Sequence, residues 1–244
     1  MLRTLVRISL ILVCLGTFST GLAQAQTLIW NVASPDVMDK GHLSLTVIPY
    51  LRPWNTGSGR NEFTYFQGVY GIGSIGSMPT EVGLNVGPID LRHTSKGTPF
   101  ADAAIKVRLL HTQLNADTLI EATIGNNVGI GLDGTTSGHV RDFVYGGLSA
   151  QFGLTGTRVS AGPYYATKEV FGGHARAGGQ FTLEQSLPLV SGLSFAADFQ
   201  TGHGGLFTPG LIWSKNQFTL GAGYGFANTG RQDDLVTLVG SFRF

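Results

Sequence analysis

Residues of the types that carry out catalysis or bind metals are few in this chain and stand apart from one another. The six histidines are His42, His93, His111, His139, His174 and His203. They form no H-E-x-x-H motif and no pair four residues apart on a helix, so the sequence indicates no metal site. Asp133 and Asp142 flank a glycine-rich stretch, but without the ligand spacing of a calcium loop.

A nucleophile, a base and an acid could in principle be assembled from Ser160, His174 and Glu184. Alternation places Ser160 and Glu184 on the same side of their segments, whereas the side on which His174 lies is undetermined. No catalytic motif surrounds any of the three. We therefore expect no catalytic residue, no cofactor-binding residue, no metal ligand and no cofactor.

The sequence GIGSIG at residues 71–76 matches the G-x-G-x-x-G pattern of nucleotide-binding proteins. In those proteins the glycines follow a strand and open a helix, whose N-terminus holds the phosphates. Here they precede a proline and another strand-like segment, SMPTEVGLNV. We interpret 71–76 as a turn.

Residues 1–25 have the layout of a secretory signal peptide. Arg3 and Arg7 precede a short apolar run, and Ala23-Gln24-Ala25 supplies a small-x-small cleavage site. The run is too short for the alternative, a membrane anchor helix. Cleavage after Ala25 would also remove Cys14, the only cysteine, so the mature chain would contain no disulfide bond.

The mature chain, 26–244, would carry almost no net charge. The whole sequence has 16 Lys and Arg against 15 Asp and Glu, and cleavage would remove Arg3 and Arg7. This excludes the basic footprint of a nucleic-acid-binding protein. Charged residues make up only 13% of the chain, and glycine occurs 36 times. The signal is followed by no apolar run of about 18 residues, the length that a membrane helix needs, which excludes a helical membrane protein.

Apolar residues instead recur at every second position, as in β-strands with one apolar face. Twelve such segments follow residue 40: 41–51, 61–70, 80–91, 103–111, 118–125, 141–152, 157–165, 174–185, 192–200, 205–213, 217–226 and 233–244. In 61–70 we assign Phe63, Tyr65 and Val69 to the outer, apolar face, with Glu62, Thr64 and Gly68 on the opposite face. The connections alternate between longer glycine-rich stretches, such as 52–61 and 125–139, and short ones, such as 113–118.

The polar faces of these segments carry Gly, Ser, Thr and Gln with isolated charges, which suits a hydrated interior better than the surface of a soluble β-sandwich, the alternative fold. Aromatic residues gather near the segment ends, as expected of girdles at membrane interfaces. The pairs are Tyr50 with Trp54, Phe63 with Tyr65, Tyr164 with Tyr165, and Trp213 with Phe218.

The last segment, DDLVTLVGSFRF, ends on an aromatic residue, and with the signal peptide and the cysteine-free body it resembles bacterial outer-membrane β-barrel proteins. The resemblance implies an antiparallel transmembrane β-barrel in the outer membrane, surrounded by its lipid, with both termini on the periplasmic side. It also implies that Phe242 and Phe244 are read by the barrel-assembly machinery. We expect about 12 strands over 41–244, with ten or eight as alternatives. Residues 26–40 would be a periplasmic lead-in or a short plug.

Ten charged side chains are expected to line or brace the lumen: Glu62, Glu81, Lys106, Arg108, Glu121, Arg158, Arg176, Glu184, Asp198 and Arg243. Rings of charge set ion preference in pores. The inward glycines of the eleventh segment, Gly221, Gly223 and Gly225, leave space for a pore or allow a loop to approach. The leading hypothesis is a porin-like passive channel for small hydrophilic solutes. A closed structural or surface-interaction barrel is the alternative, and an outer-membrane hydrolase or acyltransferase is a third.

Overall fold

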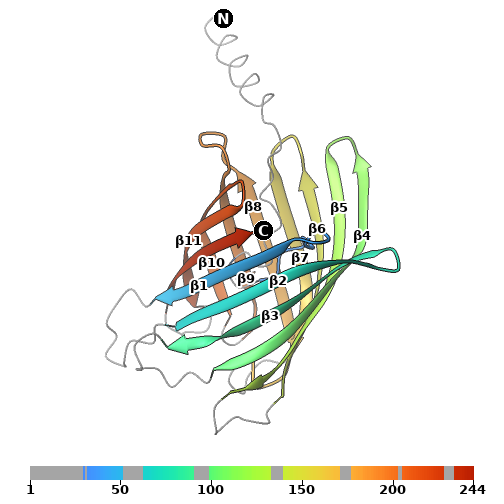
Figure 1. Ribbon diagram of the computed structural model, residues 1–244. Coiled ribbons are helices and arrows are strands. Elements are labelled where there is room, and N and C mark those ends of the chain that lie inside the picture. The colour runs from blue at the N-terminus through green and yellow to red at the C-terminus, as the bar shows by residue number, and fades with distance from the viewer. Residues whose placement is uncertain are drawn as a thin grey trace, which may run out of the picture.

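The computed structural model describes Trp30, 32–51, 63–90, 99–132, 140–170, 177–202, 205–227 and 234–244. These residues form a closed antiparallel barrel of twelve strands (Figure 1). The strands are β1 (Leu43–Leu51), β2 (Phe63–Ile75), β3 (Met78–Asp90), β4 (Phe100–Asn115), β5 (Thr118–Gly131), β6 (Val140–Phe152), β7 (Thr157–Ala166), β8 (Ala177–Ser186), β9 (Leu193–Gln200), β10 (Leu206–Lys215), β11 (Phe218–Ala227) and β12 (Leu235–Arg243). The predicted fold and strand number are confirmed.

Pairing between the first and last strands closes the barrel. Leu45 of β1 lies opposite Phe242 of β12, and the backbone N–H of Phe244 donates to the carbonyl of Leu43 at 2.8 Å. Each strand therefore has two hydrogen-bonded neighbours. A barrel without a free edge satisfies its own backbone groups, which is what a sheet in lipid requires.

The outer surface is apolar and the inner surface polar, the reverse of a soluble protein. Leu84, Leu148 and Leu211 are about half exposed on the outside, whereas Thr80, Thr208 and Thr237 are fully buried inside. This alternation is the expected pattern of a barrel surrounded by lipid. In the described part of the chain, no helix has the length and apolar character needed to cross a membrane.

Strands β2 to β6 are 13–16 residues long, whereas β7 to β12 have 8–10 residues. The hairpins β2–β3 and β4–β5 therefore project from the barrel (Figure 1). The interpretation of 71–76 as a turn is wrong, because β2 continues to Ile75 and the turn is Gly76–Ser77. Glycine-rich strands lack the polar turn residues that mark a strand end, so the sequence placed the turn too early.

The face assigned to β2 is also wrong. Tyr65 lies opposite the buried Ile48, and Phe63 opposite the buried Tyr50, so both face the interior together with Val69. The reason is that β2 carries aromatic residues on both faces: Phe66 and Tyr70 point outwards. A strand of this kind has no unique apolar face, and a one-residue shift inverts the assignment. Tyr50, Phe63, Tyr65 and Tyr164 are thus interior residues and do not belong to an interface girdle.

Candidate functional site: a segment held inside the barrel

Trp30 and residues 32–38, which precede β1 in the sequence, lie inside the barrel. We call Trp30 and Val32–Lys40 the plug segment. Trp30 is fully buried, and Val32, Val37 and Met38 are at most 5% exposed. Of the region 26–40, predicted as a lead-in or a short plug, Trp30 and 32–38 therefore lie inside the barrel, whereas Asp39 and Lys40 are exposed.

Trp30 occupies a space that glycines of the wall leave open. A Cβ atom on Gly210, Gly221 or Gly223 would lie 2.6, 2.9 or 3.2 Å from an atom of the Trp30 indole. The indole Nε1–H donates to the carbonyl of Ala196 at 3.2 Å, and the Tyr50 hydroxyl donates to the carbonyl of Trp30 at 3.2 Å. Gly221 and Gly223 thus allow another segment to approach β11 closely, which is one of the two roles considered for its inward glycines.

Asp198 of β9 binds the backbone at the start of the plug segment. The amides of Trp30 and Val32 both donate to Asp198 Oδ2, at 3.0 and 2.9 Å. Asp198 is 1% exposed. Hydrogen bonds to a buried carboxylate are among the stronger ones in proteins.

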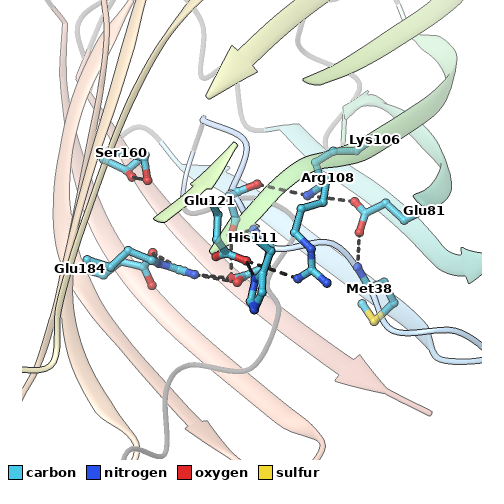
Figure 2. Close-up of polar contacts among 12 residues, drawn as sticks. Met38, Glu81, Lys106, Arg108, His111, Glu121, Ser160 and Glu184 are labelled. Carbon is cyan, nitrogen blue, oxygen red and sulfur yellow. Dashed lines mark hydrogen bonds and ion pairs between the residues drawn. The ribbon is translucent and has the colours of Figure 1, made fainter. Parts of the chain in front are cut away.

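Lys106 of β4 and Glu81 of β3 hold the middle of the plug segment (Figure 2). Lys106 Nζ lies 2.9 Å from Glu81 Oε1 and donates to the carbonyl of Ser34 at 3.2 Å. The amide of Met38 donates to Glu81 Oε2 at 2.6 Å. The pair therefore neutralises its own charges while it binds two backbone groups of the plug segment.

Arg158 of β7 links the plug segment to the opposite wall. Its Nη1 lies 2.7 Å from both carboxylate oxygens of Asp36, and its Nε donates to Glu184 Oε1 of β8 at 2.8 Å. Arg158 and Glu184 are both buried. One buried guanidinium thus joins a wall carboxylate to a plug carboxylate.

The plug segment leaves the interior beside β2. The amide of Gly41 donates to the carbonyl of Gly71 at 2.8 Å, and the amide of Gly71 donates to the carbonyl of His42 at 3.0 Å. A Cβ on Gly71 would overlap the carbonyl oxygen of Asp39. A larger residue at position 71 is therefore incompatible with this path.

The other residues predicted to line the lumen have different positions. Arg108 Nη1 and His111 Nδ1 lie 3.3 and 2.8 Å from Glu121 Oε1, at the edge of the interior (Figure 2). Arg243 is half-buried near the end of β12, opposite Ser44. Glu62 and Arg176 lie outside the described residues.

Phe242 and Phe244, predicted as the assembly signal, pack against each other with ring centroids 4.5 Å apart. Phe242 also contacts Phe218 of β11, at 4.8 Å between centroids, and Phe244 is 56% exposed. The two rings therefore lie at the closing seam of the barrel, beside β11.

Ser160 and Glu184 are bound to different partners. Ser160 lies opposite Thr182 and accepts a hydrogen bond from its hydroxyl at 2.9 Å, while Glu184 lies opposite Arg158. His174 lies outside the described residues. Within the described ranges, no three His, Cys, Asp or Glu side chains gather as metal ligands.

A cavity of about 310 Å³ lies between the plug segment and the strand ends that lead into the longer connections. Trp30 and Lys106 line it on the side of the plug segment. Its walls contain the rings of Tyr50, Phe63, Tyr65, Phe100, Phe143 and Tyr145. The polar side chains of Gln67, Asn85, Asp102, Asn127, Arg141 and Gln200 also line it.

Sequence reasoning missed Asp36, Asp102 and Arg141 as interior polar residues, and His111 as a partner of Glu121 at the edge of the interior. Asp36 belongs to a segment without periodicity, and its partner Arg158 is 122 residues away. The register of β4 shifts between Arg108 and Leu110, so alternation misplaces His111. Asp102 and Arg141 were detectable, because each continues the inward phase of its strand.

Comparisons with known proteins agree with this architecture. No protein-family model and no curated protein matches the sequence. Among solved structures, the KdgM porin in complex with disordered oligogalacturonate is similar, with a TM-score of 0.52 and 6% identity over 82% of this chain and 98% of that one. This chain has the fold of bacterial outer-membrane β-barrel proteins. A mutant porin of Rhodopseudomonas blastica (TM-score 0.39, 8% identity, 83% and 99% covered) and Ail of Yersinia pestis (0.19, 10%, 84% and 99%) also match.

Proposed function

We propose that this protein is an outer-membrane barrel for the passive passage of small polar solutes, in which the plug segment closes the lumen and must shift for passage. The proposal rests on the polar contacts that hold the plug segment in the barrel. Asp198, Glu81, Lys106 and Arg158 bind it through polar contacts.

Polar anchoring favours a movable plug over a permanent core. Each hydrogen bond to a charged group contributes about 1.5–3 kcal/mol net, and water that enters when the bond breaks can take the place of the lost partner. A permanent filling would gain more from apolar packing, since replacing buried ion pairs by well-packed apolar residues is often neutral or stabilising. Within the described plug segment, Trp30 is the residue that inserts a large apolar side chain among the wall glycines.

The apolar outer surface and the fold similarity support a place in the outer membrane, with the short turns and both barrel ends, Leu43 and Phe244, on the periplasmic side. The cleavage of residues 1–25 and the recognition of Phe242 and Phe244 by the assembly machinery remain predictions. The outer-membrane lipid and this machinery would be the partners of the protein, besides the solute.

The test is single-channel conductance in a planar bilayer, comparing the wild type with Gly221→Val. A side chain at position 221 meets the Trp30 indole, so we expect the variant to show larger or more frequent conductance steps and faster uptake of small solutes by liposomes. The matched control is Gly225→Val, on the same face of β11, where the atoms nearest to a Cβ belong to the side chains of Thr208 and Leu206, at 3.3–3.6 Å.

A heat-modifiable gel band would show that each variant is folded. If folded wild type and Gly221→Val are equally silent, the transport function is wrong, and the closed structural or surface-interaction barrel is the function to pursue.

A further inference from the structure

The cavity beside the plug segment has the features of a built binding site. Its volume of about 310 Å³ is within the range of small-molecule sites, which are mostly apolar with a few placed polar groups. Two glycines of β5 make room for its side chains. A Cβ on Gly125 would overlap the Tyr145 hydroxyl, and one on Gly129 would overlap Asp102 Oδ1.

Polar atoms of the wall lack partners within the described chain. Asp102 is 8% exposed, and its Oδ1 accepts no hydrogen bond there. Arg141 Nε is likewise buried without an acceptor, while its guanidinium carbon lies 3.4 Å from the centroid of the Phe100 ring. Leaving such groups unpaired is costly, and both residues line the cavity, so a ligand with a hydrogen-bond donor and an acceptor suits this wall better than a purely apolar one.

The charges of the wall balance. Lys106 is paired with Glu81 at 2.9 Å, and Arg141 and Asp102 contribute one charge of each sign. The described wall therefore offers no surplus of positive charge for a polyanion. This distinguishes the cavity from a site for an acidic oligosaccharide.

The apolar part of the wall combines aromatic rings with aliphatic side chains such as those of Ile48, Val69 and Leu206. Tyr50 stacks on Phe63 with centroids 5.0 Å apart, and Tyr65 meets both rings edge-on at 5.5 and 5.6 Å. Further along β2, the side-chain amide of Gln67 donates to Asn85 Oδ1 of β3 at 2.8 Å. Aromatic rings pack well on the C–H faces of a sugar ring. The neighbouring amides, carboxylate and guanidinium can bind its hydroxyl groups, so the wall matches an uncharged sugar.

We propose that this cavity binds a neutral mono- or disaccharide, with Asp102 accepting from a hydroxyl, Arg141 donating to one, and Tyr65 packing on the ring. This proposal rests on the proposed function and extends it, since the sugar would be the solute that binds beside the plug segment before it passes through the barrel. Binding can nevertheless be measured without any transport.

The experiment is isothermal titration calorimetry of the protein purified from membranes in a detergent without a sugar headgroup. Glucose and maltose are the neutral probes, phenylalanine is a zwitterion that carries an aromatic ring, and galacturonate is an anionic sugar. We expect glucose or maltose to bind more tightly than phenylalanine and galacturonate. Asp102→Asn and Tyr65→Leu should each weaken binding by about tenfold, the loss of one strong contact in a buried site.

The control is Asp117→Asn, the same substitution in the β4–β5 turn at the opposite end of the barrel, which should leave the affinity unchanged. Asp102→Asn keeps the shape of the side chain and decides the matter if Tyr65→Leu does not fold. No heat with any sugar, tighter binding of phenylalanine or galacturonate, or unchanged affinity in folded Asp102→Asn would each overturn the proposal.

The two proposals fail separately. Sugar binding by a barrel that stays electrically silent with Gly221→Val would leave the site standing and remove transport. Conductance that rises in Gly221→Val, without any sugar binding, would do the reverse.

Discussion

Single buried charges hold the plug segment, and each of them has at least one partner of opposite charge or a backbone donor. Alternation along the strands was enough to predict that Glu81, Lys106, Arg158, Glu184 and Asp198 point inwards. When one face of a strand is apolar and lies in lipid, the charged residues occupy the other face. Their contacts with the plug segment could not be predicted, since that segment has no periodic pattern that fixes which of its residues meets which strand.

The contribution of such buried charges to stability can be tested at Arg158. Arg158→Met leaves the buried carboxylate of Glu184 and the partly buried carboxylate of Asp36 without their shared cation, so we expect a loss of about 3–5 kcal/mol in the free energy of unfolding. Urea unfolding in lipid vesicles measures it. Lys168→Met is the control. Lys168 is exposed and lies 3.9 Å from Glu169, a surface pair for which we expect a change below about 1 kcal/mol. Equal changes in the two variants would show that the Arg158 contacts contribute no more than surface charge.

At the scale of strands, the twelve alternating segments gave the right number of elements, but not their ends or all their faces. β2 has rings on both faces, and what decides between them is its register with β1, a long-range property of the pairing. β4 runs beyond the segment predicted for it, to Asn115 at the turn Ala116–Asp117, and β5 runs beyond its predicted segment at the other end, to Gly131. The end of β4, from Leu109 to Asn115, is exposed on both faces.

This exposure predicts that the tip of the β4–β5 hairpin is dispensable for the barrel. Thr112 pairs with Ile120, so Gln113–Leu119 can be replaced by Asn-Gly, which forms a two-residue hairpin turn between them. We expect the shortened protein to keep its heat-modifiable band and an unfolding free energy within roughly 0.5 kcal/mol of the wild type, as for other surface changes. Failure to form the closed barrel would show that the projecting hairpin takes part in its assembly.

At the scale of the whole molecule, the barrel is polar inside and apolar outside, and this inversion follows from the low charge and the period-two pattern of the sequence. The position of an outward leucine along the strands should therefore decide what a charge there costs. Leu148, in the middle of β6, is 57% exposed, and Leu114, near the hairpin tip, is 69% exposed.

We expect Leu148→Arg to destabilise the barrel in vesicles by about 2–4 kcal/mol, the cost of an arginine at the bilayer midplane. Leu114→Arg should destabilise it by about 0–1 kcal/mol, the cost near the interface. Urea titration of both variants in the same vesicles compares the two positions. Similar losses of stability in the two variants would contradict a bilayer core that surrounds the middle of the strands.

The path of the plug segment also constrains the order in which the protein assembles. Trp30 binds Asp198, 168 residues later, and Asp36 binds Arg158, 122 residues later. The plug segment, which is made before the strands, thus depends on strands made late, and only Gly41 and His42 separate it from β1. Such distant contacts are slow to form. Because β1 is also the strand that closes the barrel with β12, sealing the wall and capturing the segment become a single late event in folding.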